Sequence, residues 1–236
     1  MSVAVRRVML SFVVLTVALL STTVASASKT QRHQTPTPTR TAVPTATPTP
    51  TATATVVASS GYSGSQAAAY ANTYWSSYNP AYPSFANQGG DCTNFVSQAL
   101  YAGGIAMRPS PPYSGNASWF IAANGGQWSY ALPWVNANDN NIFLVQHLPG
   151  VTQVASYVGV QPGQVVASHA VQGDVVLYDW NNDGIYDHEA IISTADGQNV
   201  DAHTSDRHDQ YWTLAQYNTQ WATTHLVVLH IPASAH

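Results

Sequence analysis

The chain has 236 residues, a single cysteine and a formal net charge of −4, and only 8% of its residues are charged. Beyond Arg40 the only lysine or arginine residues are Arg108 and Arg207, while every acidic residue lies from Asp91 onward. The C-terminal part is therefore acidic, which excludes nucleic acid or another polyanion as its main partner.

The first 27 residues have the features of a secretory signal peptide. A basic start, MSVAVRR, precedes the apolar run VMLSFVVLTVALL and the small residues Ala25-Ser26-Ala27. The apolar run is short for a membrane span, which needs about 20 apolar residues. We therefore expect cleavage after Ala27 rather than a retained anchor, and no stable membrane span afterwards. This predicts a protein that is secreted, with association to the cell wall as one option.

Residues 28–60 alternate threonine with proline and contain almost no large apolar side chains. Such a segment cannot bury enough surface to offset the entropy of ordering it, so we expect a disordered tether. Residues 61–236 then form one domain, a normal size for a single core.

The predicted domain begins with two helices. Residues 65–78 carry Ala68, Ala71, Trp75 and Tyr78 at helical spacing, before Pro80. The stretch DCTNFVSQALYAGG then predicts a helix with Asp91 as N-cap and an apolar face that includes Cys92. Residues 105–134 are expected to be irregular, and residues 135–148 a third helix.

From about Val151 the pattern changes to short runs rich in β-formers. These runs are VTQVASYV, GDVVLYDW, HEAIIST, NVDAHT and THLVVLHI, separated by Gly, Asn and Asp. Helices first and strands afterwards predict an α+β domain, with N-terminal helices packed on a mostly antiparallel sheet.

Cys92 is the only cysteine of a chain that we expect to be exported. An unpaired thiol in an oxidising compartment is a liability unless it has a use. The first turn of a helix carries partial positive charge, which stabilises a thiolate. A small buried hydrophobe is the alternative. The context favours a catalytic nucleophile, with the Cys92 backbone N–H as an oxyanion donor.

A cysteine nucleophile needs a base within hydrogen-bond reach and usually a third group that orients the base. His188 begins the run HEAIIST, and the turn ADGQ joins it to NVDAHT. With Asp196-Gly197 as the two central turn residues, Ala190 faces His203. His188, Asp201 and His203 then share one face of the sheet.

The blocks GGDCTNFVSQALYAGG, QGDVVLYDWNNDGIYDHEAIIST and VDAHTSDR, in this order, resemble the putative amidase domain family within the NlpC/P60- and CHAP-like cysteine peptidases. The resemblance covers about residues 68 to 207. It implies a papain-like fold, with the cysteine on a helix packed against a sheet that carries the histidine. Carried over by position, Cys92 is the nucleophile, His188 the base and His203 the orienting residue. Asp201 is the alternative third residue.

The implied reaction is acyl transfer from an amide to the thiol and then to water. Because related domains cut peptidoglycan, the resemblance suggests a stem-peptide bond or the sugar–peptide amide as the substrate. No cofactor is required for this chemistry, and we expect a monomer. One alternative is a non-catalytic module that binds cell wall or glycan. Another is a metal-dependent hydrolase that uses His203, Asp206, His208 and Asp209, although that cluster lacks a recognised ligand spacing.

The stretch DWNNDGIYDHE resembles part of a calcium-binding loop. Its oxygen ligands would be Asp179, Asn181, Asp183, the Ile185 carbonyl and Asp187. No glutamate occupies the twelfth position, where Ala190 stands. The alternative is a polar turn in which Asn and Asp bond their own backbone and Gly184 takes a positive φ. The missing ligand favours the turn.

Overall fold

The computed structural model describes residues 61–110 and 115–236, and the predicted signal peptide and tether lie outside these ranges. The helices are α1 (Gly64–Tyr74), α2 (Cys92–Ala102), α3 (Leu132–Val135) and α4 (Ala137–His147), with a 3-10 turn at Ala215–Tyr217. The strands are β1 (Ile121–Asn124), β2 (Gln127–Tyr130), β3 (Thr152–Val158), β4 (Val175–Asp179), β5 (His188–Ile192), β6 (Asn199–Ala202), β7 (Arg207–Tyr211) and β8 (His225–His230). In the described part of the chain, no helix has the length and apolar character of a membrane span.

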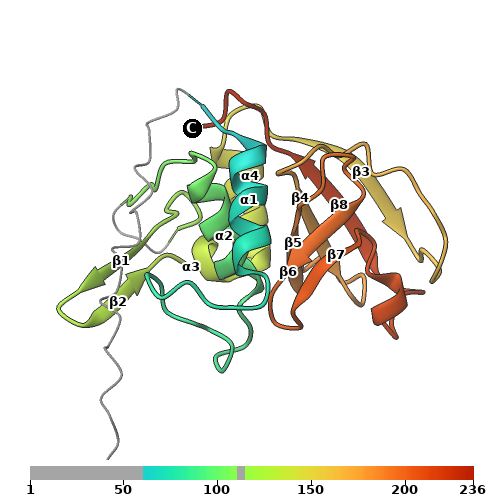
Figure 1. Cartoon of the computed structure of the whole chain (residues 1–236), viewed down its shortest axis with the longest axis horizontal. Coiled ribbons are helices and arrows are strands. Elements are labelled where there is room, and N and C mark those ends of the chain that lie inside the picture. The colour runs from blue at the N-terminus through green and yellow to red at the C-terminus, as the bar shows by residue number, and fades with distance from the viewer. Residues whose placement is uncertain (1–60, 111–114) are drawn as a thin grey trace, which may run out of the picture. The chain divides into compact units, whose positions relative to one another are not determined.

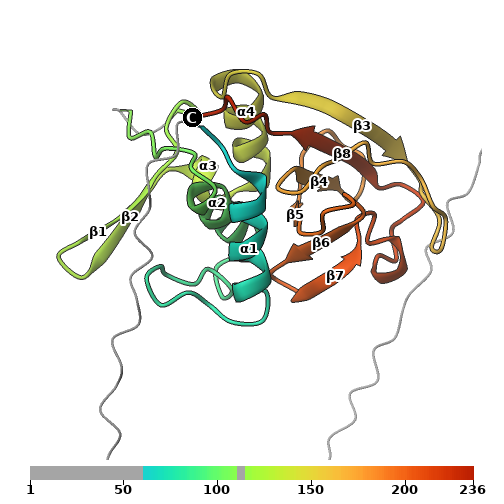
Figure 2. The same ribbon diagram turned by 45° about the horizontal axis from the view of Figure 1, so that its top comes forward.

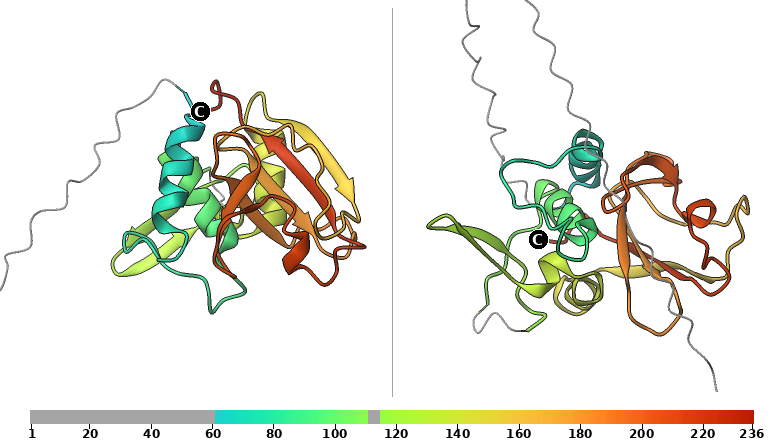
Figure 3. Two further views of the ribbon diagram at one scale, coloured as in Figure 1. Left: turned by 45° about the vertical axis from the view of Figure 1, so that its right-hand side comes forward. Right: turned by 90° about the horizontal axis from the view of Figure 1, so that it is seen from below.

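The domain is α+β, as the order of helices and strands predicted. Six strands form one sheet in the order β3-β8-β4-β5-β6-β7, and every neighbouring pair is antiparallel. The helices lie together against one face of this sheet, and the β1–β2 hairpin projects from the far side of the helices (Figures 1 and 3). The predicted helix at residues 135–148 is confirmed by α4.

The sheet separates two apolar clusters. The first joins the helices to the inward face of the sheet and includes Phe95, Leu100, Leu177 and Ile191. The second lies on the other face and includes Tyr178, Ala190 and Ile192. Trp212 and Leu214, which follow β7, cover that second face. Figure 2 shows the strands curving around this side.

Helix α2 is the central element of the helical layer. Every residue from Thr93 to Leu100 is buried, so the helix is enclosed on all sides and does not present the single apolar face that we predicted. Its polar residues are satisfied inside the core, because the indole N–H of Trp134 donates to Asn94 Oδ1 at 3.0 Å and that of Trp119 donates to Ser97 Oγ at 3.1 Å. The enclosure fixes the position of the residues at the start of the helix.

Several local predictions were wrong. Helix α1 ends at Tyr74, short of Tyr78, and Trp75 stacks on His208 instead of joining the core, with ring centroids 4.8 Å apart. The region predicted to be irregular contains the β1–β2 hairpin and α3. Strand β7 lies in the polar stretch RHDQY, which has neither the apolar alternation nor the β-branched residues of a typical strand. Pairing with β6 is what makes it a strand.

Candidate active site

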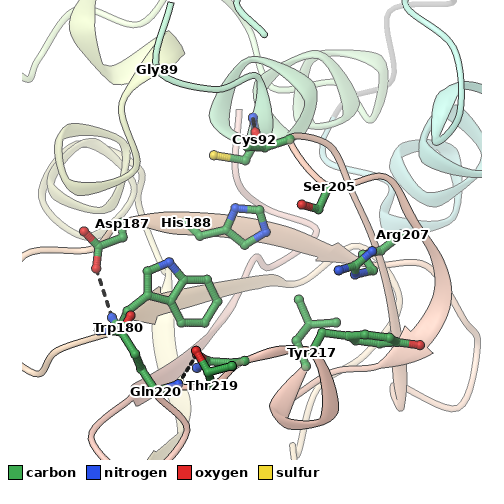
Figure 4. A pocket seen from close by; sticks show the side chains of 13 residues that line it. Gly89, Cys92, Trp180, Asp187, His188, Ser205, Arg207, Tyr217, Thr219 and Gln220 are labelled. Carbon is green, nitrogen blue, oxygen red and sulfur yellow. Dashed lines mark hydrogen bonds between the residues drawn. The ribbon is translucent and has the colours of Figure 1, made fainter. Parts of the chain in front are cut away.

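Cys92 is the first residue of α2 and is partly exposed, although all eight residues after it are buried. Its side chain lies in the wall of a cleft of about 390 Å³ that His188 and Arg207 also line (Figure 4). It also borders a second, adjoining hollow of about 280 Å³, formed in part by Tyr186 and Asn136. Cys92 is thus partly exposed and borders both cavities, unlike the enclosed residues that follow it in α2.

The main chain just before and at Cys92 is held by Thr204, which follows β6. The Thr204 hydroxyl oxygen accepts the N–H groups of Asp91 at 2.8 Å and Cys92 at 3.1 Å. Thr204 has φ +78°, an unusual value for a β-branched residue, which makes the conformation strained. Gly90 permits the close approach, because a Cβ there would lie 2.9 Å from the Thr204 oxygen. The Cys92 N–H that we predicted as an oxyanion donor is therefore already bonded.

Asp91 occupies the N-cap position as predicted, but its carboxylate does not cap the helix. Oδ1 accepts the Phe85 N–H at 2.7 Å and the Asn94 amide at 3.0 Å, and Oδ2 lies 2.8 Å from Nδ1 of His203. The Thr204 hydroxyl takes the helix-start N–H groups instead. The carboxylate is thus free to bind the imidazole.

His203 has both ring nitrogens engaged, since Nε2 lies 2.7 Å from the Tyr74 carbonyl oxygen. Its ring stacks on Phe95 with centroids 4.1 Å apart. Desolvation lowers the pKa of His203, but the hydrogen bonds to Asp91 and Tyr74 outweigh it and raise the pKa above its ordinary value. His203 therefore holds the turn that carries Cys92, and none of its hydrogen bonds is to His188.

His188 begins β5, and its ring lies beside the rings of Tyr178 and Trp180, with centroid distances of 5.4 and 5.7 Å. No hydrogen bond of its imidazole occurs within the described ranges. Burial and, to a smaller extent, the Arg207 charge lower the pKa of His188 to about 4, and Asp187 partly opposes both. The imidazole is therefore neutral at pH 7, which is the form that accepts a proton.

The predicted register of the β5–β6 hairpin was wrong by one residue. Ile191 pairs with Asp201 and Ile192 with Val200, whereas the prediction placed Ala190 opposite His203. The Gly197 N–H donates to the Thr194 carbonyl at 3.1 Å, so Ala195 and Asp196 form the centre of the turn and Gly197 follows it with φ +71°. This extra residue, typical of a type I turn followed by a bulge, shifts the pairing.

The shifted register separates the predicted third residues from His188. Asp201 pairs with Ile191, whose side chain belongs to the helix-facing cluster, while His188 alternates with Ile192 on the other face. The Asp201 Oδ1 atom lies 3.1 Å from Ser193 Oγ and 3.1 Å from His208 Nδ1. His188 and Cys92 instead both line the cleft.

Glu189 is a buried residue near Cys92 that the sequence analysis did not single out. Its side chain is fully buried, and neither carboxyl oxygen has a hydrogen-bond partner in the described part of the chain. Burial raises the pKa of Glu189 well above its usual value, and the nearby Cys92 raises it further. The signal in the sequence was the only glutamate of the chain, placed inside the run HEAII.

The DWNNDGIYD segment forms the polar turn. The Asp179 oxygens accept the N–H groups of Asp183 at 3.1 Å and Gly184 at 2.8 Å. The Asp183 oxygens are occupied by the Asn181 amide and the Ile185 N–H, both at 2.9 Å. Gly184 has φ +88°, as the turn interpretation predicts. The segment thus has the contacts of the polar turn, and calcium binding stays a prediction.

The residues of the alternative metal site point to separate partners. His203 binds Asp91 and His208 binds Asp201, while the Asn199 amide donates to Asp209 at 2.9 Å. Across the described ranges, no three His, Cys, Asp or Glu side chains are arranged to hold a metal ion. Two further histidines have partners outside these groups: His230 pairs with Asp174 at 3.0 Å, and His225 Nε2 lies 2.9 Å from Ser156 Oγ.

Comparison with known families identifies the domain. A family model described as "Putative amidase domain" matches residues 61–227, which includes Cys92, His188 and the turn at Thr204. The chain belongs to this family. The family description indicates an amide hydrolase.

Two uncharacterized proteins of Bacillus subtilis (strain 168) are similar to this amidase-domain protein. YhbB is 30% identical over 168 residues, and the match covers 70% of this chain and 49% of YhbB. YjcM is 31% identical over 142 residues, covering 57% of this chain and 28% of YjcM. The chain thus spans half or less of the length of these relatives. No solved structure matches it.

Proposed function

We propose that this amidase-domain protein is a secreted, cysteine-dependent amide hydrolase that acts on cell-wall peptidoglycan, at a stem-peptide bond or the sugar–peptide amide. The observation that carries the proposal is the partly exposed thiol of Cys92 at a helix start, in one cleft with the neutral imidazole of His188. A papain-like fold related to the NlpC/P60 and CHAP peptidases would place the same two groups on a helix and a strand.

In the first half-reaction, His188 takes the Cys92 proton and the thiolate attacks the amide carbonyl carbon, which forms a C–S bond. The imidazolium then returns the proton to the amide nitrogen as the C–N bond breaks, so the amine leaves and a thioester remains. In the second half, water gives a proton to His188 and attacks the thioester. The acid product and the thiolate separate, and the proton returns to Cys92. No metal takes part in these steps.

The two cavities that meet at Cys92 support an extended substrate. The cleft with His188 and the hollow with Tyr186 share Cys92, Gly89 and Asp187 in their walls. A chain lying across Cys92 would therefore have one side of its scissile amide in each cavity. This arrangement fits a peptide or a glycan-linked peptide better than a small free amide.

The oxyanion formed during attack needs hydrogen-bond donors. The Cys92 N–H can serve only if the substrate oxygen replaces the Thr204 hydroxyl as its acceptor. The Thr204 hydroxyl itself lines the cleft and carries a proton that it can donate. We therefore propose that Thr204 and the Cys92 N–H act together on the oxyanion.

The contacts of His203 support a positioning role rather than direct orientation of His188. It binds Asp91, the residue before the nucleophile, and is next to Thr204, which binds the Cys92 N–H. Asp201 has no contact of this kind with Cys92 or His188, so His203 remains our choice of third residue.

The test is to incubate the full chain with purified peptidoglycan and to analyse the soluble fragments by mass spectrometry. We expect fragments with a new amine end from the wild-type protein and none from Cys92→Ala or His188→Ala. The control is His230→Ala, which removes a histidine–carboxylate pair far from the cleft. Fragments released equally by Cys92→Ala would overturn the proposal. Binding to the wall without release of fragments would favour a non-catalytic binding module. Loss of activity on addition of a chelator would favour a metal-dependent hydrolase.

A further inference from the structure

Arg207 is the one arginine that lines the cleft, and no carboxylate among the described residues pairs with its charge. It begins β7 and lines the cleft together with Cys92 and His188. Its guanidinium carbon lies 4.3 Å from the centroid of the Tyr217 ring. Stacking on an aromatic face fixes the plane of the guanidinium and leaves its N–H edge available for a ligand.

Among the described residues, the N–H edge of the Arg207 guanidinium forms few hydrogen bonds. The hydrogen bond that the structure gives Arg207 is a long one, from Nη1 to the Asp206 carbonyl oxygen at 3.4 Å. Throughout the described residues, which include every Asp and Glu of the chain, no carboxylate forms an ion pair with Arg207. By contrast, both terminal nitrogens of Arg108 donate to main-chain oxygens, of His147 and His236.

The cleft is also asymmetric in charge. Figure 4 shows Arg207 and Tyr217 on one side of His188 and Asp187 on the other. Asp187 is held there by the Trp180 N–H, which donates to Oδ2 at 2.9 Å. An anion would therefore settle on the Arg207 side. One guanidinium matches the single charge and the two oxygens of a carboxylate.

We propose that Arg207 binds a carboxylate of the substrate, and that the preferred substrates carry a free carboxylate close to the scissile amide. This inference rests on the proposed function, because it takes Cys92 as the point of attack. Arg207 is then a specificity-determining residue, with Tyr217 as its support. Substrates in which that carboxylate is an amide would leave Arg207 unpaired in the cleft and bind more weakly.

The alkylation of Cys92 tests this inference directly, because the chain has no other cysteine. Iodoacetate and iodoacetamide place the same carbon on the thiol and differ in carrying a carboxylate or an amide. The iodoacetate rate is divided by the iodoacetamide rate, once for the folded protein and once for the same protein unfolded in urea. Comparison of the two ratios isolates the effect of the cleft. We expect the folded ratio to exceed the unfolded one by roughly tenfold, the size of one charge-assisted hydrogen bond.

Two substitutions show whether Arg207 is responsible. In Arg207→Gln the ratio should fall to the unfolded value, because a change in the reactivity of Cys92 itself alters both rates equally and cancels in the ratio. In Arg207→Lys, which keeps the charge but loses the planar fork, the ratio should lie between the values of the wild-type protein and Arg207→Gln. A ratio that is unchanged in Arg207→Gln would overturn the inference.

If Cys92 proves unreactive, that result refutes the proposed function. A second measurement then tests the carboxylate site at Arg207 by itself. The Nε–H signal of Arg207 is followed by NMR in Cys92→Ala during titration with N-acetylalanine and, separately, with N-acetylalaninamide. We expect the acid to shift the signal and the amide to leave it in place. Equal responses, or none, would overturn the carboxylate site whatever the role of Cys92.

Discussion

The Nδ1 atom of His203 lies 2.8 Å from Oδ2 of Asp91, and both side chains are buried. This pair connects the end of β6 to the residue just before Cys92, although 112 positions separate the two partners in the chain. The neighbouring Thr204 adds two hydrogen bonds to the same turn. The position of the thiol thus depends on a contact between the sheet and the helical layer.

Replacing His203 should reduce activity far more than an equivalent change elsewhere. His203→Ala leaves the Asp91 carboxylate buried without its partner, which costs on the order of 3 kcal/mol. We expect kcat/KM to fall by at least about 100-fold, since displacement of a catalytic group by about 1 Å has this effect. His230→Ala is the matched control, because His230 pairs with buried Asp174 at 3.0 Å, at the other end of β4 from the cleft. It should lower the melting temperature but change kcat/KM less than about threefold.

Urea unfolding and steady-state kinetics on both variants provide the measurement. Equal losses of activity in the two variants would show that His203 contributes only to general stability. A Cys92 alkylation rate that is unchanged in His203→Ala would also contradict a positioning role, since the thiol would then be held without it.

The pKa values of His188 and His203 should be shifted in opposite directions. The pKa of His188 is lowered to about 4, mainly by burial, while the hydrogen bonds to Asp91 and Tyr74 outweigh desolvation and raise that of His203 above its ordinary value. Activity that requires neutral His188 should persist as the pH falls, until it is lost near pH 4. An NMR titration of the imidazole carbons checks both values. Assignment of a pKa of 6.5 or higher to His188 would contradict the prediction.

The same shifts have opposite effects on stability. Between about pH 4 and the ordinary histidine pKa near 6.5, unfolded chains bind a proton at His188 that the folded protein does not, so this group lowers stability as the pH falls. His203 contributes stability that is fully present below its unfolded pKa and is lost as the pH rises through its higher folded pKa. Arg207→Gln should raise the pKa of His188 without restoring its ordinary value, because burial is the larger cause of the shift.

Glu189 should be a source of instability that grows with pH. Its folded pKa lies well above the unfolded one, so at pH values between them the folded state holds a proton that the unfolded state has released. Stability therefore falls as the pH rises above about 4.5. Glu189→Gln should remove this dependence. Glu189→Met should also remove the unsatisfied polar atoms, and we expect it to be more stable at pH 8 by about 1–3 kcal/mol.

Urea unfolding of these variants at pH 5 and pH 8 makes the comparison, with Asp196→Asn as an exposed control. A pH dependence that is the same in Glu189→Gln and the wild-type protein would show that Glu189 is ionised in the folded state. If Glu189→Met folds more stably but loses activity, the carboxyl contributes to the site beside Cys92.

The turn between β4 and β5 should not respond to calcium. Its carboxylate oxygens already accept main-chain and amide N–H groups, so an ion would have to displace them. We expect millimolar calcium to leave the melting temperature unchanged, and Asp183→Ala to lower it equally with and without the ion. A calcium-dependent rise that Asp183→Ala abolishes would restore the ion-binding hypothesis.

Local sequence determined the elements whose patterns are self-contained. The helix at residues 135–148 and the runs that became β3, β4, β5 and β8 were predictable, because apolar periodicity directly reflects which face is buried. The α+β class followed from their order. The single cysteine at a helix start and a histidine at a strand start were also visible, since residue type and position in an element are local properties.

Only the tertiary structure decided how these residues meet. One extra residue in the turn, Gly197, moved Asp201 to the face opposite His188, and a period of two makes any such shift complete. The Thr204 hydroxyl replaced Asp91 as the acceptor at the start of α2, which left Asp91 for His203. Glu189 became a buried acid with a raised pKa because α2 covers that face of β5. Each outcome depends on contacts between residues distant in the chain, and no local pattern encodes them.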